Sequence, residues 1–325
     1  MSDDDFDDRV NDDRANDSGD LDDRGTNGTY FDDRGLDGAD FDDEGESFGG
    51  RKDRRRPKGA RHRKELLSES SADANSPFTD AGLRALHARG TLTELGRQVR
   101  GGKEATVYRA AGTEGPLAAK VYSDSEVRSF QADNAYLVGR HVSDRRIRKM
   151  LGDAKRRGLS PELAHWVFHE YRMLWKLNEA GFPVPRPAVG PDPAEMVEAG
   201  RVVLMDWVGD EEPAPRLADV QLEPSEAEAA WQQACELLIE LLKLGLVHGD
   251  LSTFNLLWWQ RKLVLIDLPQ VVEIDRNKHA GDLLDRDARS LCSSFRSFGI
   301  DQDPAQLLLR ARQAAGYPPS GRLSH

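Results

Sequence analysis

Two carboxylates and one amide in the last quarter of the sequence have a spacing that suits catalysis. Asp250 and Asn255 stand five residues apart in the segment HGDLSTFN, and Asp267 ends the apolar run LVLID. In phosphoryl transfer to a hydroxyl, one carboxylate orients the nucleophile and takes its proton, while an amide and a second carboxylate hold the Mg²⁺ that bridges the phosphates. Mg²⁺ prefers hard oxygen ligands and keeps several waters, so few protein donors suffice. The spacing therefore predicts phosphoryl-transfer chemistry.

A buried ion pair is predicted upstream of this segment. Apolar residues recur with the helical period, and Glu170 falls on the same stripe; the apolar members are Leu163, Trp166, Val167, Leu174 and Leu177. An ionised carboxylate that faces the interior is costly unless it is paired, so the pattern requires a buried cation. Lys120, in LAAKVY, is the only lysine upstream in an apolar strand. The alternative is that Glu170 lies at the edge of the stripe and reaches water.

Two more segments have the composition of nucleotide contacts. The segment GGKEATVY (residues 101–108), which includes Gly102 and Lys103, precedes Lys120 but lacks the spacing G-x-G-x-x-G. Two adjacent glycines form a turn as readily as a phosphate cradle. The strand expected at residues 201–208 runs into a connector, where a kinase would bind adenine through backbone groups while Met205 lined the pocket. The alternative is a buried edge strand with a core methionine.

In this order, the residues resemble the RIO family of atypical protein kinases, and in particular its first subfamily. GGKEATVY is similar to the family pattern S-x-G-K-E-A-x-V-Y, HGDLSTFN to H-x-D-L-S-x-x-N, and IDLPQVV to I-D-x-x-Q-x-V. The likeness covers about residues 80–300. Two departures stand out: Arg100 occupies the serine position of the first pattern, and Pro269 replaces a small residue after Asp267.

The resemblance implies a role for each candidate residue. Asp250 would be the catalytic base, Asn255 and Asp267 would hold Mg²⁺, or Mn²⁺ in its place, and Asp267 would also accept phosphate if the protein acts as an ATPase. The residues implied to contact ATP are Lys120, which would pair with Glu170 and contact the α- and β-phosphates, Gly102 and Lys103 of the glycine loop, Met205, and the backbone of Asp206 and Val208.

The function implied is that of an ATP-dependent serine/threonine protein kinase that phosphorylates a protein substrate or itself, with ATPase activity through an aspartyl-phosphate as a variant. Members of the family act in small-ribosomal-subunit maturation. Two alternatives stay open: a small-molecule phosphotransferase of the aminoglycoside or choline kinase type, which shares H-G-D and a later I-D, and an ATP-gated ribosomal RNA-binding factor. The short, non-acidic sequence after Asp267 favours the RIO-type reading over the phosphotransferase.

The elements that must position these residues follow from cap and turn signals. We expect a short helix ending near Gly90, two strands within residues 104–122, a helix from Ser160 to Gly181, a strand at 201–208, a helix with a capping box at Ser225 and Glu228 that ends at Gly245, two short strands around Asn255 and Asp267, and two C-terminal helices. Residues 123–158 read as a long functional or partly ordered loop.

The expected fold is α+β and bilobal, like a protein kinase: a small antiparallel N-lobe sheet with a regulatory helix, and a minimal, mainly helical C-lobe without an activation segment.

The net charge of −12 over 325 residues is unevenly distributed. Residues 1–50 contain 17 Asp and two Glu against four Arg, residues 51–65 contain nine Lys and Arg against two acids, and the rest carries a net charge of −4. We expect a disordered acidic repeat tail at 1–50, a basic linker at 51–76, the kinase N-lobe at 77–204 and the C-lobe at 205–325.

The basic run at residues 51–64 could contact ribosomal RNA phosphates, since each neutralised phosphate releases counterions. Pairing with the acidic tail and simple solvation are the alternatives. The sequence contains no run of 18 apolar residues and no secretory signal pattern, so a cytoplasmic protein without membrane contact is expected.

Overall fold

The computed structural model describes residues 66–67, 76–102, 105–123 and 145–323. All of them belong to one compact unit, Arg54–His325. The acidic tail, the basic run at 51–64 and Lys103 lie outside the described residues, so the predictions made for them stay predictions.

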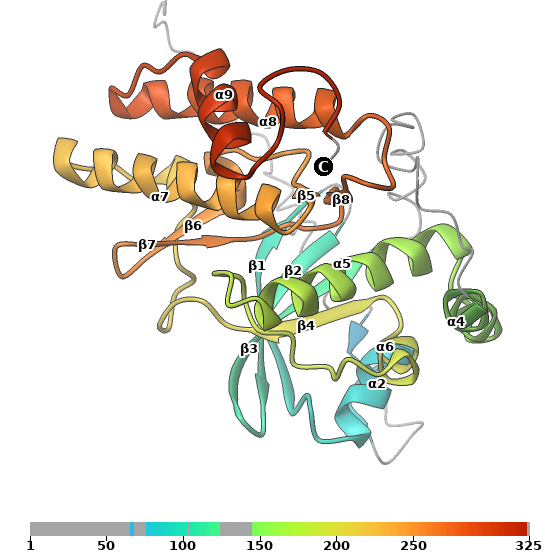
Figure 1. Cartoon of the computed structure of the whole chain (residues 1–325). Coiled ribbons are helices and arrows are strands. Elements are labelled where there is room, and N and C mark those ends of the chain that lie inside the picture. Colours follow the sequence, from blue (N-terminus) through green and yellow to red (C-terminus); the bar gives the residue numbers. More distant parts are fainter. Residues whose placement is uncertain (1–65, 68–75, 103–104, 124–144, 324–325) are drawn as a thin grey trace, which may run out of the picture. The chain divides into compact units, whose positions relative to one another are not determined.

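A four-stranded antiparallel sheet carries several of the predicted nucleotide contacts (Figure 1). Its strands lie in sequence order: β1 (Glu94–Gly101), β2 (Ala105–Gly112), β3 (Gly115–Tyr122) and β4 (Val202–Asp206). Lys120 on β3 stands opposite Val107 of β2 and Val203 of β4, so it lies on an inner strand. The two strands predicted within residues 104–122 are β2 and β3, joined by a turn between Gly112 and Gly115. β1 was not predicted, and its register against β2 shifts twice, which interrupts the period of two that marks a strand in sequence.

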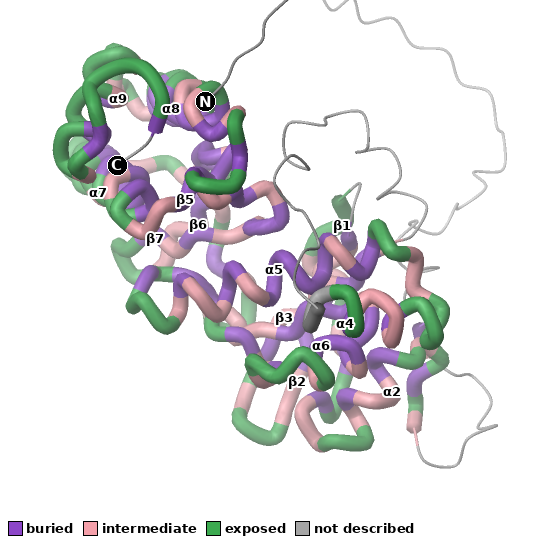
Figure 2. Tube along the Cα trace, turned by 45° about the vertical axis from the view of Figure 1, so that its right-hand side comes forward, coloured by how far each residue is buried: buried purple, intermediate pink, exposed green. Residues whose placement is uncertain are grey.

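Helix α5 (Pro161–Glu179) carries Glu170, and most of it is buried (Figure 2). Ser160 caps its start, because its Oγ accepts a hydrogen bond from the Leu163 backbone N–H at 3.3 Å, and Pro161 occupies the first turn. Gly181, with φ of 73°, ends it. The helix predicted from Ser160 to Gly181 is confirmed.

Three shorter helices accompany the sheet: α2 (Ala81–Ala88), α4 (Arg145–Arg156) and α6 (Pro193–Ala199). The first was predicted. Helix α4 lies inside the segment expected to be a partly ordered loop. Most of its residues are charged or polar, so the two buried positions, Met150 and Ala154, give only a weak helical pattern in the sequence. Helix α6 was missed because it has only seven residues, although Asp192 caps it with a hydrogen bond to the Ala194 N–H at 2.8 Å.

The C-terminal half is mainly helical, with α7 (Pro224–Lys243), α8 (Ala280–Phe295) and α9 (Pro304–Ala314). The capping box predicted at Ser225 and Glu228 is wrong: the capping position is Glu223, two residues before Ser225, the helix begins at Pro224, and no side chain caps it. Proline is favoured at the first helical position because its fixed φ suits the helix and its missing N–H would have no partner there. Gly245, with φ of 70°, follows the end of the helix as predicted.

Short strands and single turns of 3₁₀ helix frame the predicted catalytic residues. The strands are β5 (Leu246–Val247), β6 (Leu256–Trp259), β7 (Lys262–Leu265) and β8 (Val272–Glu273), and the turns are η2 (Leu217–Asp219), η3 (Thr253–Asn255) and η4 (Arg296–Phe298). β6 pairs with β7, and β5 with β8. An antiparallel sheet followed by a mainly helical half confirms the predicted α+β, kinase-like fold.

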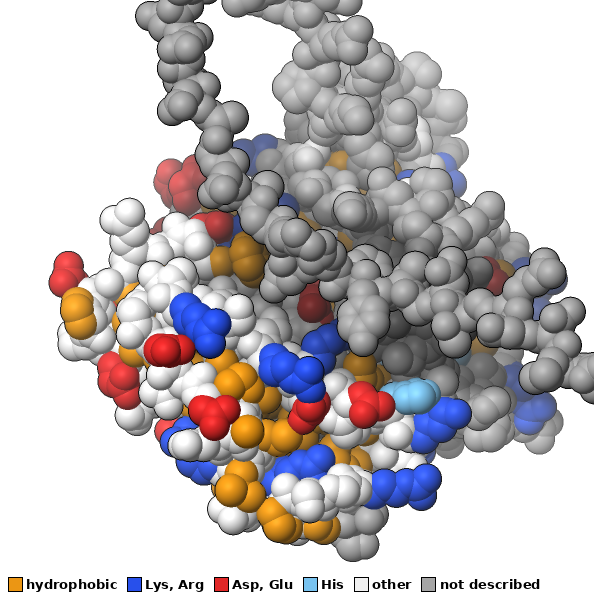
Figure 3. Space-filling model, turned by 90° about the horizontal axis from the view of Figure 1, so that it is seen from above, with side chains coloured by type: hydrophobic (Ala, Val, Ile, Leu, Met, Phe, Trp, Pro, Cys, Tyr) orange, Lys and Arg blue, Asp and Glu red, His pale blue; other side chains and the backbone are white. Residues whose placement is uncertain are grey.

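The surface of the described part is mixed in charge. Acidic and basic side chains are interspersed over the face shown in Figure 3, in keeping with the small net charge of the sequence after residue 65. None of the helices in the described ranges is both long and apolar enough to cross a membrane.

Candidate active site

Lys120 joins two acidic residues from different parts of the chain. Its Nζ lies 2.7 Å from Glu170 Oε1 on α5 and 2.8 Å from Asp267 Oδ1, which follows β7. The Glu170 side chain is 2% exposed and that of Lys120 12%, whereas Asp267 is 39% exposed. The buried cation that the apolar stripe of α5 requires is therefore Lys120, and Asp267 is the member of the cluster that solvent or a ligand can reach.

Tyr122 completes the surroundings of Glu170. Its hydroxyl donates a hydrogen bond to Glu170 Oε2 at 2.5 Å, so both carboxylate oxygens have a donor. Sequence reasoning missed this residue, although a signal exists: residues two apart on a strand share a face, and Tyr122 follows Lys120 by two. The neighbouring Tyr171 holds α5 against β4, because its hydroxyl donates to the Val202 carbonyl and accepts from the Leu204 N–H, both at 2.9 Å.

The charges in this cluster support one another. Burial lowers the pKa of Lys120, but Asp267 and Glu170 outweigh it and hold that pKa well above its ordinary value. Burial raises the pKa of Asp267, but the Lys120 ammonium more than offsets it, so the net shift is downward. For Glu170, burial is the larger effect and its pKa is raised, with Lys120 and Tyr122 opposing the shift. Lys120 is thus a cation, and Asp267 a carboxylate, across the physiological range.

Asp250 is held by Asn255. The Asn255 Nδ2 donates to the Asp250 carbonyl at 2.8 Å and to its carboxylate Oδ2 at 3.0 Å. Burial raises the pKa of Asp250, the Asn255 hydrogen bond lowers it, and the charge of Asp267 raises it; the net shift is upward. A carboxyl group whose pKa lies above its usual range is better suited to take a proton than an ordinary surface Asp.

The hairpin of β6 and β7 places Asn255 near Asp267. Leu256 pairs with Leu265 at the hairpin end, and the Ile266 N–H then donates to the Asn255 carbonyl at 3.0 Å. Asp267 has φ of 66°, a left-handed conformation that is unfavourable for most residues with a side chain and that Asp tolerates better than most. The strand thus turns sharply at the residue predicted to hold the metal.

The donors fit a magnesium ion. Because the Asn255 side chain bonds Asp250 through its Nδ2, its Oδ1 is the atom that suits a metal, beside the ionised and partly exposed Asp267. No group of three or more His, Cys, Asp or Glu residues forms a metal-binding cluster within the described ranges. An ion that keeps most of its waters and takes one amide and one carboxylate oxygen suits this donor set better than one that needs a protein cage.

A buried carboxylate supports the loop that carries Asp250. Asp287 on α8 is fully buried; its two oxygens accept hydrogen bonds from the Gly249 and Leu251 N–H groups, each at 2.8 Å. Arg286 donates to the Gly249 carbonyl, at 3.1 Å from its Nε. Burial raises the pKa of Asp287 to about 7, with the two backbone bonds opposing it. Asp250 is thus fixed from both sides by bonds to its neighbours' backbone.

His248 is a packed residue of the same loop. It is fully buried, its Nδ1 accepts the Asp250 N–H at 3.3 Å, and burial lowers its pKa to about 4. It is therefore neutral at physiological pH and serves as part of the packed scaffold of the loop.

The connector after β4 has backbone groups that could form hydrogen bonds with a ligand. The Asp206 N–H donates to the Arg186 carbonyl at 2.8 Å, so a ligand would have to use the Asp206 carbonyl instead. The Val208 carbonyl accepts the Ala214 N–H at 2.9 Å, which directs a ligand to the Val208 N–H. Met205 pairs with Ala118 and is partly buried. Gly102 closes the β1–β2 turn, with its N–H donating to the Ala105 carbonyl at 2.9 Å.

Comparison with known proteins identifies the family. The RIO domain family matches residues 106–307, which include every residue of the cluster around Lys120 and the loop of Asp250. The chain belongs to the RIO family.

The relatives are RIO kinases by name. Serine/threonine-protein kinase RIO1 of Caenorhabditis elegans is 34% identical over 226 residues, covering 69% of this chain and 41% of the nematode protein. RIO-type serine/threonine-protein kinase Rio1 of Haloferax volcanii is 31% identical over 233 residues, covering 70% of this chain and 73% of the archaeal protein. Human serine/threonine-protein kinase RIO1 is 30% identical over 237 residues, covering 72% of this chain and 38% of the human protein. The chain thus spans about two fifths of the nematode and human relatives. The resemblance to the first RIO subfamily is confirmed.

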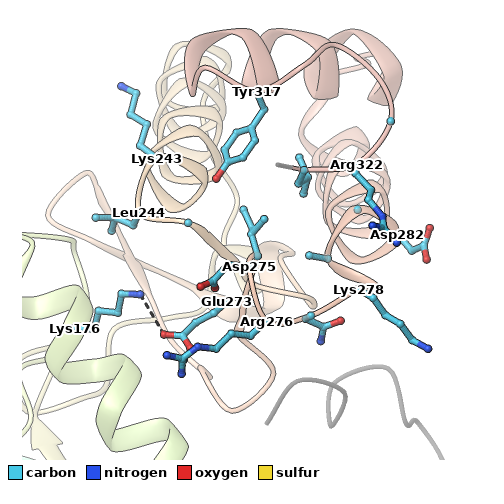
Figure 4. A pocket seen from close by; sticks show the side chains of 17 residues that line it. Lys176, Lys243, Leu244, Glu273, Asp275, Arg276, Lys278, Asp282, Tyr317 and Arg322 are labelled. Atoms are coloured by element: carbon cyan, nitrogen blue, oxygen red, sulfur yellow. Dashed lines mark hydrogen bonds and ion pairs between the residues drawn. The ribbon is translucent and has the colours of Figure 1, made fainter. Parts of the chain in front are cut away.

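The described part of the chain also contains a separate cavity of about 1040 Å³ (Figure 4). It lies between the end of α7, residues 273–282 and the C-terminal residues 317–323, and none of the predicted site residues lines it. Its wall includes Glu273, which accepts a hydrogen bond from Lys176 of α5 at 3.5 Å. This contact links the helix of Glu170 to β8.

Proposed function

We propose that this protein is an ATP-dependent serine/threonine protein kinase of the RIO type. The observation that carries the proposal is the contact of Lys120 with both Glu170 and Asp267, beside an Asp250 that Asn255 holds in place. Phosphoryl transfer needs little covalent help from a protein and depends on positioning and charge stabilisation, which this arrangement can supply.

We assign the binding of ATP and the metal to the following residues. The Lys120 ammonium, fixed by Glu170, binds the α- and β-phosphates of ATP. The adenine binds the Asp206 carbonyl and the Val208 N–H, with Met205 in the pocket wall. Gly102 and Lys103 cover the phosphates. Asn255 Oδ1 and Asp267 would hold Mg²⁺, or Mn²⁺ in its place, and the ion would neutralise charge on the phosphate oxygens.

Asp250 acts on the acceptor. A serine or threonine hydroxyl attacks the γ-phosphorus in line, the bond between γ-phosphorus and the β–γ bridging oxygen breaks, and ADP leaves with the bond's electron pair. The hydroxyl proton passes to the Asp250 carboxylate. General-base help of this kind is worth roughly 10²- to 10⁴-fold in rate.

Asp267 supports a second activity, ATP hydrolysis through an aspartyl-phosphate. It is ionised and 39% exposed, and Lys120 holds it in place. In this variant a carboxylate oxygen of Asp267 attacks the γ-phosphorus and ADP leaves; water then hydrolyses the acyl phosphate and regenerates the carboxylate.

The test is phosphate transfer from γ-labelled ATP by the full chain, with itself and casein as acceptors. Asp250→Ala should lower transfer by about 10²- to 10⁴-fold, whereas Asp282→Ala, a change at an exposed residue of α8, should leave it unchanged. Hydroxylamine treatment separates the activities, because it releases phosphate from an aspartyl-phosphate and leaves phosphoserine intact. Equal transfer by wild type and Asp250→Ala, or Asp250-dependent transfer to choline or kanamycin but not to protein, would overturn the proposal.

The finer assignments belong to the same proposal. They are cytoplasmic location, a role in small-ribosomal-subunit maturation, contact of residues 51–64 with ribosomal RNA, and the division into lobes at residue 204. They rest on the resemblance and on the composition of the sequence.

A further inference from the structure

Phe254 is a large apolar side chain that stays in solvent beside the proposed catalytic base. It is 53% exposed, and among the described residues only Leu309 on α9, at 41%, is a comparable case. Burial of a phenylalanine side chain favours folding by about 1.5–3 kcal/mol, so an exposed one contributes little to stability. Phe254 belongs to η3, between Asp250 and Asn255.

The Phe254 ring is held from one side by Arg216. The guanidinium carbon lies 5.1 Å from the ring centroid, a cation–π contact. Arg216 is itself fixed by two bonds to Asp219, from Nε to Oδ2 at 2.8 Å and from Nη2 to Oδ1 at 3.0 Å. Its backbone also forms a β-bridge with Leu257. The ring is thus ordered before any partner arrives, which lowers the entropic cost of binding.

The same contacts continue to the glycine loop. Arg100, at the end of β1, places its Nη1 3.7 Å from Asp219 Oδ2. This is the residue that replaces the serine of the family pattern. A continuous row of side chains, Arg100, Asp219, Arg216 and Phe254, therefore runs from the strand before the phosphate-covering loop to the loop of Asp250.

Phe254 lies in the same loop as the proposed base. Phe254 is the chain neighbour of Asn255, whose side chain is bonded to the Asp250 carboxylate at 3.0 Å. An extended peptide advances about 3.3–3.6 Å per residue. A polypeptide whose hydroxyl reaches Asp250 therefore has its neighbouring residues near the loop that carries the ring.

We propose that Phe254 forms a docking site for an apolar side chain of the polypeptide substrate, close in sequence to the serine or threonine that receives phosphate, and that Arg216 is the positioning residue of the ring. The proposal rests on the proposed kinase function and adds a substrate class to it: polypeptides with an apolar residue near the acceptor.

The experiment uses the full chain and a library of serine peptides in which each position near the acceptor is varied. Wild type should prefer Leu, Ile, Met or Phe at one position. Phe254→Ala should lose that preference and raise the KM of the preferred peptide about tenfold, while Phe254→Leu restores part of it. Leu309→Ala, the matched control on α9, should keep the preference. Arg216→Ala should raise the peptide KM with little change in kcat, and should add little to Phe254→Ala because both act through the ring.

The outcomes are distinguishable. If Phe254→Ala keeps the same apolar preference as Leu309→Ala while Asp250-dependent transfer to peptide is intact, the docking site is wrong and the kinase function stands. If wild type transfers no phosphate to any peptide or protein, both proposals fall together.

Discussion

The Lys120 ammonium lies 2.7 Å from a carboxylate oxygen of Glu170, 50 residues further along the chain, and almost no water reaches the pair. Breaking a buried pair by removing one partner is costly, because the remaining charge is left without compensation. Here Lys120 has a second acid, Asp267, so the loss of Glu170 would change where the ammonium points as well as how stable the fold is.

Replacing Glu170 with Gln should therefore affect both stability and nucleotide binding. We expect a loss in the free energy of unfolding that is smaller than the about 3–5 kcal/mol of a buried charge left without a partner, because Asp267 still pairs with Lys120. We also expect a weaker affinity for ATP, because Lys120 is drawn towards Asp267. Urea denaturation and nucleotide titration measure the two effects. Glu212→Gln is the control: it removes a salt bridge of Arg97 at the surface and should change neither quantity measurably. Equal stability of the two variants would show that the buried pair is not required.

Replacing Tyr122 with Phe should remove one donor from Glu170 without changing the shape of the core. The change leaves a buried acceptor without its donor, so we expect a loss of about 1–3 kcal/mol in the free energy of unfolding. Combined with Glu170→Gln, the loss should differ from the sum, because the Tyr122 hydroxyl bonds the carboxyl group that the second change replaces. Additive losses in a double-mutant cycle would mean that the hydroxyl stabilises the fold through another group.

These two residues show how much of the site can be predicted from sequence. The pairing of Lys120 with Glu170 follows from periodicity and from the cost of a buried charge. Tyr122 could have been added from the alternation of strand faces. Asp287 could not, because its partners are backbone N–H groups of residues 249 and 251, and backbone groups leave no mark in a sequence. The irregular strand β1 and the short helix α6 were missed because each departs from the length or period that predicts such elements.

Asp287 should make stability depend on pH. Its pKa is about 7 in the folded protein and about 4 when exposed, as in an unfolded chain. A raised pKa means that this group stabilises the fold fully below about pH 4 and loses that contribution as the pH rises through 7. Between pH 5 and pH 8, the free energy of unfolding of wild type should therefore fall by roughly 2–3 kcal/mol relative to that of Asp287→Asn. Urea denaturation at several pH values measures it, and a constant difference would contradict the assignment.

Asn255 should control the protonation of Asp250 as well as the metal. Its hydrogen bond opposes the burial that raises the pKa of Asp250, so Asn255→Ala should raise that pKa further. Because the base must be ionised to accept a proton, the acid limb of kcat/KM should move to higher pH in the variant. Measurement at saturating Mg²⁺ separates this shift from weaker metal binding, which lowers activity at every pH. A variant with lower activity but an acid limb at the wild-type position would show that Asn255 serves the metal alone.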